Sequence, residues 1–208
     1  MNINCTNKTN FKAKIIAKSG KITICKLNSA EDIKFLQDFC KRTDYKKLMP
    51  QLSEREAERW HEMLEYATFC AKNPGNTTYI ELLNNKLWGI VTCFQNPTTI
   101  IDCICSIPVN IGEKVKLAGK TLFFQIFKDF VEYRGKRMKL SAITNGPYNT
   151  INKYKDLGFK ETSNITKTYV EMDANQYAIK NSLKKLEDII PYRPVPERKI
   201  DLKEFVIN

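Results

Sequence analysis

Hydrophobic residues near the start of the chain follow patterns that predict a strand pair and then a helix. Residues 12–27 hold two apolar runs on either side of Ser19 and Gly20, which is typical of a β-hairpin. Ser29 is a good helix N-cap residue, and Asp32 lies three positions later, near the positive end of the helix dipole. Apolar residues then recur at helical spacing, so a helix is expected to follow the hairpin.

A second helix and a run of strands are predicted next. Ser53 and Glu56 have the spacing of a capping box, and the apolar stripe that follows is that of an amphipathic helix. Three segments rich in β-branched and aromatic residues come after it, at 77–83, 87–94 and 99–107. Because the links between them are short and turn-like, three antiparallel strands in series are expected.

The pattern changes in the second half of the chain. A loop over 109–119 precedes a segment with a wide apolar helical face, and residues 137–144 predict a strand. Pro147 is expected to open a further helix, and residues 160–172 predict a final strand or hairpin. The order of elements predicts an α/β protein whose sheet is antiparallel at first and contains a βαβ unit later.

The two ends of the chain differ from its middle. Residues 1–21 are predicted to be an N-terminal extension or a hairpin strand. Residues 173–208 predict a C-terminal helical and extended appendage, because a short helical segment is followed by three prolines and a charged tail. Residues 22–172 remain as the main domain, in line with a length of 208 residues.

The composition of the chain predicts its cellular compartment and the state of its cysteines. No apolar run is long enough to span a membrane, and the N-terminus lacks the apolar core of a signal peptide. A cytoplasmic protein is therefore expected, with no membrane partner, although secretion of a non-classical type stays open. The seven cysteines are expected to be free thiols. No metal site is expected, because the spacing of Cys103 and Cys105 is not that of zinc ligands and His61 is the only histidine.

The charge of the chain favours a polyanionic partner. The formal net charge is +11, and residues 111–140 hold eight Lys/Arg against three Asp/Glu. Nucleic acid, a phosphorylated cofactor and an acidic surface all remain open as that partner.

A candidate phosphate site lies where the loop meets the Phe-rich helix. The first amides of a helix lack internal partners, and a glycine lets a phosphate approach the backbone closely. The residues expected to hold the phosphate are Lys116, Leu117, Ala118, Gly119, Lys120 and Thr121. A plain turn with solvated lysines is the alternative. A P-loop is excluded, because Lys114 stands where its first glycine would be.

A second motif lies about thirty residues further on. Tyr154 is followed by Gly158 and Phe159, which is the pattern of a helix that ends at a left-handed glycine. Phe159 is then expected to pack on Tyr154, one turn back. This structural role is sufficient to explain the motif when it is taken alone.

Together the two motifs resemble those of the GCN5-related N-acetyltransferase (GNAT) family, over roughly residues 22–172. The family's phosphate loop has the pattern (Gln/Arg)-x-x-Gly-x-(Gly/Ala), which is matched here by Lys116, Gly119 and Thr121. Its later pattern, Asn-x-x-Ala-x-x-x-Tyr-x-x-x-Gly-Phe, is matched at Tyr154 and the Gly-Phe pair. The sequence departs from both patterns: Lys and Thr replace two loop residues, and the Ala and Asn positions hold Thr150 and Pro147.

The resemblance implies a fold and an activity. The implied fold is a mixed, largely antiparallel sheet that splays after its fourth strand and is flanked by about four helices. The implied activity is transfer of an acetyl group from acetyl-CoA directly to an amine-bearing acceptor. The fourth strand would be residues 99–107, and its amides near Ile104, Ser106 and Ile107 would stabilise the oxyanion. Asn145 or Asn149 would replace the missing Asn.

The resemblance also implies roles in proton transfer. Tyr154 matches the family's proton donor to the CoA sulfur. Asp102 and Glu81 are both candidates for the general base, with a slight preference for Asp102, and a chain of water molecules is a further alternative. His61 is expected to be a partly exposed helix residue.

Two classes of function remain open. One is an acetyl-CoA-dependent N-acetyltransferase acting on a small molecule or a protein. The other is a non-catalytic binding module on the same fold, or an acetyltransferase whose substrate is associated with nucleic acid, such as charged tRNA. The acceptor is not readable from the sequence, and the protein is expected to be a monomer or a homodimer.

Overall fold

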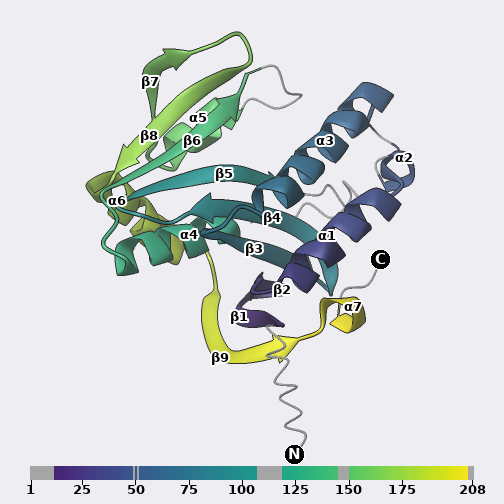
Figure 1. Ribbon diagram of the computed structural model, residues 1–208. Coiled ribbons are helices and arrows are strands. Elements are labelled where there is room, and N and C mark those ends of the chain that lie inside the picture. Colours follow the sequence, from purple (N-terminus) through teal and green to yellow (C-terminus); the bar gives the residue numbers. More distant parts are fainter. Residues whose placement is uncertain (1–11, 49, 51, 107–118, 145–149, 206–208) are drawn as a thin grey trace, which may run out of the picture.

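The computed structural model describes residues 12–48, 50, 52–106, 119–144 and 150–205. In this part of the chain nine strands form one sheet, in the order β7-β8-β6-β5-β4-β3-β2-β1-β9. Neighbouring strands are antiparallel except for β5 and β6, which are parallel. The mixed, largely antiparallel sheet predicted from the sequence is confirmed (Figure 1).

The first strands follow the predicted pattern closely. The hairpin consists of β1 (Ala13–Ser19) and β2 (Ile22–Lys26), which turn at Gly20. Three antiparallel strands in series follow later, β3 (Asn76–Leu83), β4 (Lys86–Phe94) and β5 (Thr98–Ser106). Both predictions are therefore confirmed.

The remaining strands build the two edges of the sheet. β6 (Arg137–Ile143) pairs with β5 on one side and with β8 (Tyr169–Asn175) on the other, and β7 (Lys160–Ile165) forms a hairpin with β8. At the opposite edge, β9 (Tyr192–Ile200) pairs antiparallel with β1. The segment that follows the predicted main domain thus adds a strand to the same sheet.

One face of the sheet is covered by helices. These are α1 (Ala30–Arg42), α2 (Tyr45–Leu48), α3 (Glu54–Cys70) and α7 (Leu202–Phe205). Both expected N-caps are present, with a capping box at the start of α1 and another at the start of α3. Buried side chains of α1, α3 and the sheet form one apolar cluster under this layer. The caps fix where the helices begin, and the apolar stripes fix which face packs on the sheet.

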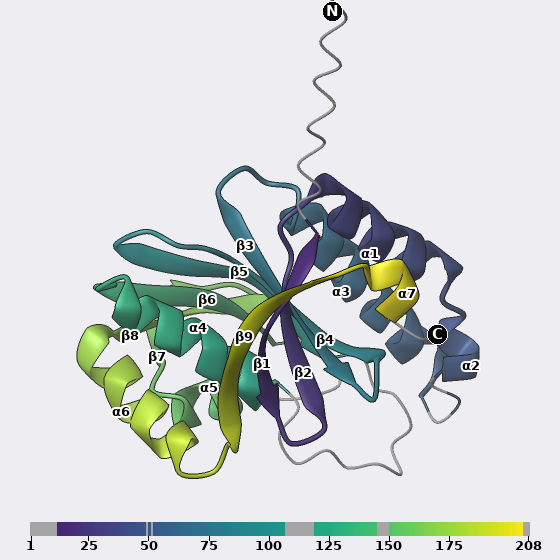
Figure 2. The ribbon, with the colours of Figure 1, turned by 90° about the horizontal axis from the view of Figure 1, so that it is seen from below.

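The other face carries α4 (Lys120–Glu132), α5 (Thr150–Asp156) and α6 (Gln176–Glu187) (Figure 2). The apolar face of α4 is buried against the sheet and α6, in a second apolar cluster. Ser182 of α6 donates a hydrogen bond to the carbonyl of Leu157, at 2.9 Å. The C-terminal segment therefore helps to hold the end of α5.

The sheet opens between β5 and β6. Their parallel pairing runs from Thr98 and Arg137 to Ile101 and Leu140, and no further pair joins the two strands in the described residues. β5 continues to Ser106 and β6 to Ile143, so the strands fan apart (Figure 1). β5 is the fourth strand when β2 is counted as the first, so the predicted splay is present.

Candidate active site

A cleft of about 720 Å³ lies where β5 and β6 diverge, and we call it the β5–β6 cleft. It is bounded by α3, β5, β6, α5 and β8, and its volume suits a ligand of drug-like size. Three sequence-predicted site residues line it, namely Asp102, Ile104 and Tyr154. Its other polar and aromatic residues include Glu62, Tyr66, Lys139, Tyr169 and Glu171.

Asp102 reaches the cleft through a β-bulge. On β4, Thr92 pairs with Cys103 and Cys93 pairs with Ile101, so Asp102 is left without a strand partner. A bulge re-aims the side chains that follow it. The Asp102 carboxylate accepts a hydrogen bond from Asn76 Nδ2, at 2.7 Å. Partial burial raises the pKa of Asp102 above its usual range, and the bond from Asn76 partly offsets this.

Tyr154 enters the cleft from α5, and the predicted helix ending fixes its position. Gly158 has a φ of +89°, and the amide of Phe159 donates to the carbonyl of Tyr154 at 3.0 Å. The Phe159 ring packs on the Tyr154 ring with a centroid distance of 6.3 Å, as expected. The ring of Phe123 on α4 also packs on the Tyr154 ring, with a centroid distance of 5.8 Å. Burial raises the pKa of Tyr154 to about 12, so its hydroxyl stays protonated at neutral pH.

The N-terminus of α4 lies beside the end of β5. Gly119 is its N-cap residue, has a φ of +77° and makes no side-chain capping bond. A Cβ placed on Gly119 would lie 3.6 Å from the hydroxyl oxygen of Ser106. Lys120 is exposed and Thr121 is buried. The helix therefore begins without a side-chain cap and with an exposed lysine next to the open end of the diverging strands, and its dipole favours an anion there.

Glu81 lies apart from the β5–β6 cleft. Its side chain is fully buried between the sheet and α4, and a Cβ on Gly89 would lie 2.9 Å from Oε2. Burial raises its pKa to about 8, and the amides of Gly119 and Leu122 partly offset this. Neither carboxyl oxygen has a hydrogen bond of good geometry to a described residue. The structure thus separates the two candidate bases, with Asp102 at the cleft and Glu81 beneath the start of α4.

Several predicted site residues lie outside the described part of the chain. These are the oxyanion candidate Ile107, the loop residues Lys116, Leu117 and Ala118, and the two candidates for the missing Asn, Asn145 and Asn149. Pro147, the expected start of α5, also lies there.

The sequence did not point to Asn76, nor to Lys139 and Glu171, which line the cleft on β6 and β8. Asn76 bonds both Asp102 and the carbonyl of Cys70, which joins β3, β5 and the end of α3. Glu171 on β8 accepts from Lys139 Nζ on β6, at 3.2 Å. The alternation along β8 does place Glu171 on one face, but only strand pairing shows that this face borders the cleft.

Solved structures of acetyltransferases share this fold. PaiA N-acetyltransferase from Thermoplasma acidophilum, in complex with coenzyme A, is 19% identical over 74% of this chain and 98% of its own, with a TM-score of 0.50. FdhC, a nucleotide-linked sugar GNAT, is 13% identical over 82% and 95%, with a TM-score of 0.53. A GNAT-family protein from Desulfovibrio desulfuricans is 12% identical over 74% and 99%, with a TM-score of 0.51.

The protein therefore has the GNAT fold, and the resemblance inferred from its two motifs is confirmed at the level of the fold. No known protein-family profile matches the chain, and no curated protein matches it in sequence. Within the described residues, no helix is both long and apolar enough to cross a membrane.

Proposed function

We propose that the protein is an acetyl-CoA-dependent N-acetyltransferase, which moves an acetyl group directly to a primary amine within a ternary complex. The observation that carries this proposal is the β5–β6 cleft, which Asp102 and Tyr154 both line. The start of α4 lies next to Ser106, at the end of the strand that carries Asp102. A carboxylate and a phenol that line the same cleft are the groups that such a reaction needs, one to accept a proton and one to donate it.

The start of α4 fits the phosphates of acetyl-CoA. Its helix dipole and the absence of a side-chain cap at Gly119 favour an anion, and the ammonium group of Lys120 adds a positive charge. Gly119 presents backbone without a side chain at this point, next to Ser106. A substrate that lies along the open end of β5 and β6 would have its phosphates at α4 and its acetyl group in the cleft. The coenzyme A complex of PaiA, a protein of the same fold, supports this assignment.

Each residue has a defined task in this proposal. Asp102 accepts a proton from the ammonium form of the acceptor, directly or through water. Backbone amides of β5 near Ile104 and Ser106, on the edge that no longer pairs with β6, stabilise the oxyanion that forms as nitrogen attacks the thioester carbon. As the carbon–sulfur bond breaks, Tyr154 donates its proton to the thiolate. The raised pKa of Asp102 makes it a stronger base than an exposed aspartate.

The lining of the cleft favours a cationic amine as acceptor. Carboxylates at Glu62, Asp102 and Glu171 face the cleft together with Tyr66 and Tyr169, whereas one lysine, Lys139, lines it and pairs with Glu171. Carboxylates attract an ammonium group, and aromatic faces add cation–π attraction.

The proposal is tested first by binding. Calorimetry and thermal unfolding with acetyl-CoA, with ADP as the control, should show micromolar binding of acetyl-CoA and a higher melting temperature. Acetylation of a panel of mono-, di- and polyamines is then followed by release of free CoA thiol. Absence of acetyl-CoA binding at micromolar concentration would overturn the proposal.

The net charge of +11 supports a second candidate, a protein that acts on a nucleic-acid-associated substrate or binds nucleic acid without catalysis. Binding to RNA or DNA should then weaken steeply as salt rises, because counterions are released when phosphates are neutralised. Retention that is weak and insensitive to salt would remove this candidate.

A further inference from the structure

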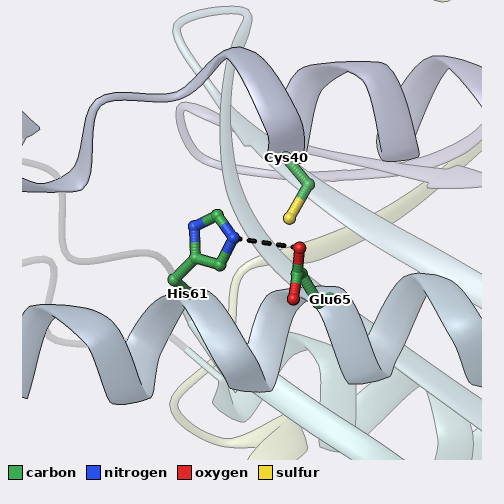
Figure 3. Close-up of side chains that lie close together, drawn as sticks. All are labelled: Cys40, His61 and Glu65. Carbon is green, nitrogen blue, oxygen red and sulfur yellow. Dashed lines mark ion pairs between the residues drawn. The ribbon is translucent and has the colours of Figure 1, made fainter.

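Three side chains outside the β5–β6 cleft point toward one another between α1 and α3. They are Cys40 from the last turn of α1, and His61 and Glu65 from α3. One donor atom of each residue lies within 4.8 Å of the others, and His61 Nε2 is 3.0 Å from Glu65 Oε1 (Figure 3). Among the residues that the structure describes, this is the group with the geometry to hold a metal ion.

The packing of two helices produces this cluster. His61 and Glu65 are four positions apart, so they share one face of α3. Leu36 of α1 and Leu64 of α3 belong to the same buried cluster, which holds the two helices side by side. Cys40 is 1% exposed and faces α3, whereas Glu65 is exposed. The cluster is therefore anchored in the core on one side and open to water on the other.

The arrangement differs from that of a catalytic Cys-His-Glu relay. In a relay the imidazole joins the acid and the nucleophile through its two different nitrogens. Here Nε2, the nitrogen that pairs with Glu65, is also the one turned toward Cys40 (Figure 3). Three donor atoms that lie within 4.8 Å of one another suit a shared metal ion better than a proton relay.

We infer that Cys40, His61 and Glu65 bind a divalent ion of the zinc type, with water as the fourth ligand. Thiolate, imidazole and carboxylate are the ligands that zinc accepts, with bonds of about 2.0–2.3 Å. Tetrahedral bonds of that length place the ligand atoms roughly 3.3–3.8 Å apart. The donor atoms of the present cluster lie within 4.8 Å of one another, so binding requires them to move closer by about 1 Å. The Cys40 thiol loses its proton to solvent as the metal–sulfur bond forms.

Tyr45 supports this site from α2. Its hydroxyl lies 3.5 Å from Cys40 Sγ and 3.4 Å from the Cys40 carbonyl oxygen, so it can donate to the thiolate. The edge of its buried ring meets the His61 ring, with a centroid distance of 4.4 Å. Groups that bond or orient ligands in this way raise metal affinity.

The ion would join α1 to the helix that forms one wall of the β5–β6 cleft. Glu62, Met63 and Tyr66, which line the cleft, are interleaved along α3 with His61 and Glu65. A bound ion would fix the position and rotation of that helix. The metal site itself does not depend on the proposed acetyltransferase activity.

Titration of the reduced full-length protein with Co²⁺ tests the site, because a thiolate–cobalt bond gives a near-ultraviolet charge-transfer band. One equivalent of Co²⁺ should produce this band, Zn²⁺ should displace it, and Zn²⁺ should raise the melting temperature. Cys40→Ala should lose the band, and His61→Gln should weaken binding by about tenfold or more. Cys25→Ala, which removes a buried thiol of the same core cluster, should leave the spectrum unchanged.

Three results would overturn the inference: no thiolate band in the folded wild type, a band that survives Cys40→Ala, or a band lost equally in Cys25→Ala. If Cys40→Ala does not fold, His61→Gln decides the matter, because His61 is only partly buried. Wild-type affinity for Co²⁺ in folded His61→Gln, checked by circular dichroism, would show that the cluster is an ordinary His-Glu ion pair beside a thiol.

Discussion

At the scale of single residues, Tyr154 combines a structural and a chemical position. Its carbonyl accepts the hydrogen bond that ends α5, and its ring packs between Phe123 and Phe159. Its hydroxyl group is left to serve the chemistry of the β5–β6 cleft, which Tyr154 lines. Because the ring does the packing, the two roles can be separated by removing one oxygen atom.

Tyr154→Phe should therefore keep the fold and lose turnover. We expect kcat for acetyl transfer to fall by about 10²-fold, since the thiolate leaves without a positioned proton donor. The affinity for acetyl-CoA in calorimetry and the melting temperature should change little. Tyr177→Phe is the matched control, because Tyr177 is 75% exposed on α6 and should have no effect. Full turnover in Tyr154→Phe would leave Tyr154 with its structural role alone.

At the scale of elements, the start of α4 is the point where sheet, loop and helix meet. Its N-cap residue is a left-handed glycine, and a buried glutamate of β3 lies beneath its first amides. Both features belong to the same helix end, yet substitutions at Gly119 and at Glu81 are expected to change different properties. The glycine bears on the binding of acetyl-CoA, and the glutamate bears on the pH dependence of stability.

Gly119→Ala should weaken the binding of acetyl-CoA. An alanine at a φ of +77° costs about 1–2 kcal/mol, and relaxation of that strain moves the amides that would face the phosphates. Gly20→Ala is the control, because Gly20 has a φ of +59° in the β1–β2 turn with open space around it. Both variants should lose similar stability in urea unfolding, but only Gly119→Ala should bind acetyl-CoA less tightly. Equal affinity in the two variants would count against a phosphate site at α4.

Glu81→Gln should change how stability depends on pH. The folded-state pKa of Glu81 is about 8, against 4.5 for an unperturbed glutamate, so the fold favours the protonated form. The contribution of Glu81 to the free energy of unfolding is fully present below about pH 4.5 and is lost as the pH rises through 8. The loss is at most about 1.4 kcal/mol per pH unit. The free energy of unfolding should therefore decrease less in Glu81→Gln than in the wild type between pH 5 and pH 9. Glu58→Gln, an exposed change on α3, should leave the wild-type slope unaltered.

At the scale of the whole molecule, segments from both ends of the chain complete one sheet and its two core layers. β1 and β9 pair at one edge, and Ile200 and Leu202 are buried in the same cluster as α1 and α3. α6 contributes Ile179 and Leu186 to the other cluster. The segments that flank the predicted main domain therefore contribute to the core, while the cleft lies at the opposite part of the sheet.

Leu202→Ala should lower stability without changing catalysis. Leu202 is 2% exposed, and truncating a buried leucine costs about 2–5 kcal/mol. Chemical denaturation should show this loss, whereas kcat per folded molecule should equal that of the wild type. Lys203→Ala, one exposed position further along α7, should cost no more than about 0.5 kcal/mol. A large fall in kcat for Leu202→Ala would mean that α7 is coupled to the cleft.

Local signals in the sequence were enough to predict much of the fold. The caps at Ser29 and Ser53, the hairpin turn at Gly20 and the ending at Gly158 each depend on a few neighbouring residues, and all are present. The bulge at Asp102 and the bond from Asn76 could not be predicted in this way. They depend on the register of β5 against β4 and on the packing of residues 26 positions apart.

The sequence by itself determined the helix caps, the first hairpin, the three strands in series and the helix ending at Gly158, because capping, periodicity and turn chemistry act over a few residues. The role of Tyr154 as candidate proton donor was implied by the resemblance to the GNAT family. Only the tertiary structure decided that Asp102 faces the cleft while Glu81 is sealed under α4, because strand register sets which face a side chain occupies. The same holds for Cys40 and His61. No metal site was predicted, because the spacing of Cys103 and Cys105 is not that of zinc ligands and the chain has a single histidine. The packing of α1 on α3 nevertheless brings Cys40 and His61 together with Glu65, because helix packing joins residues that are distant along the chain.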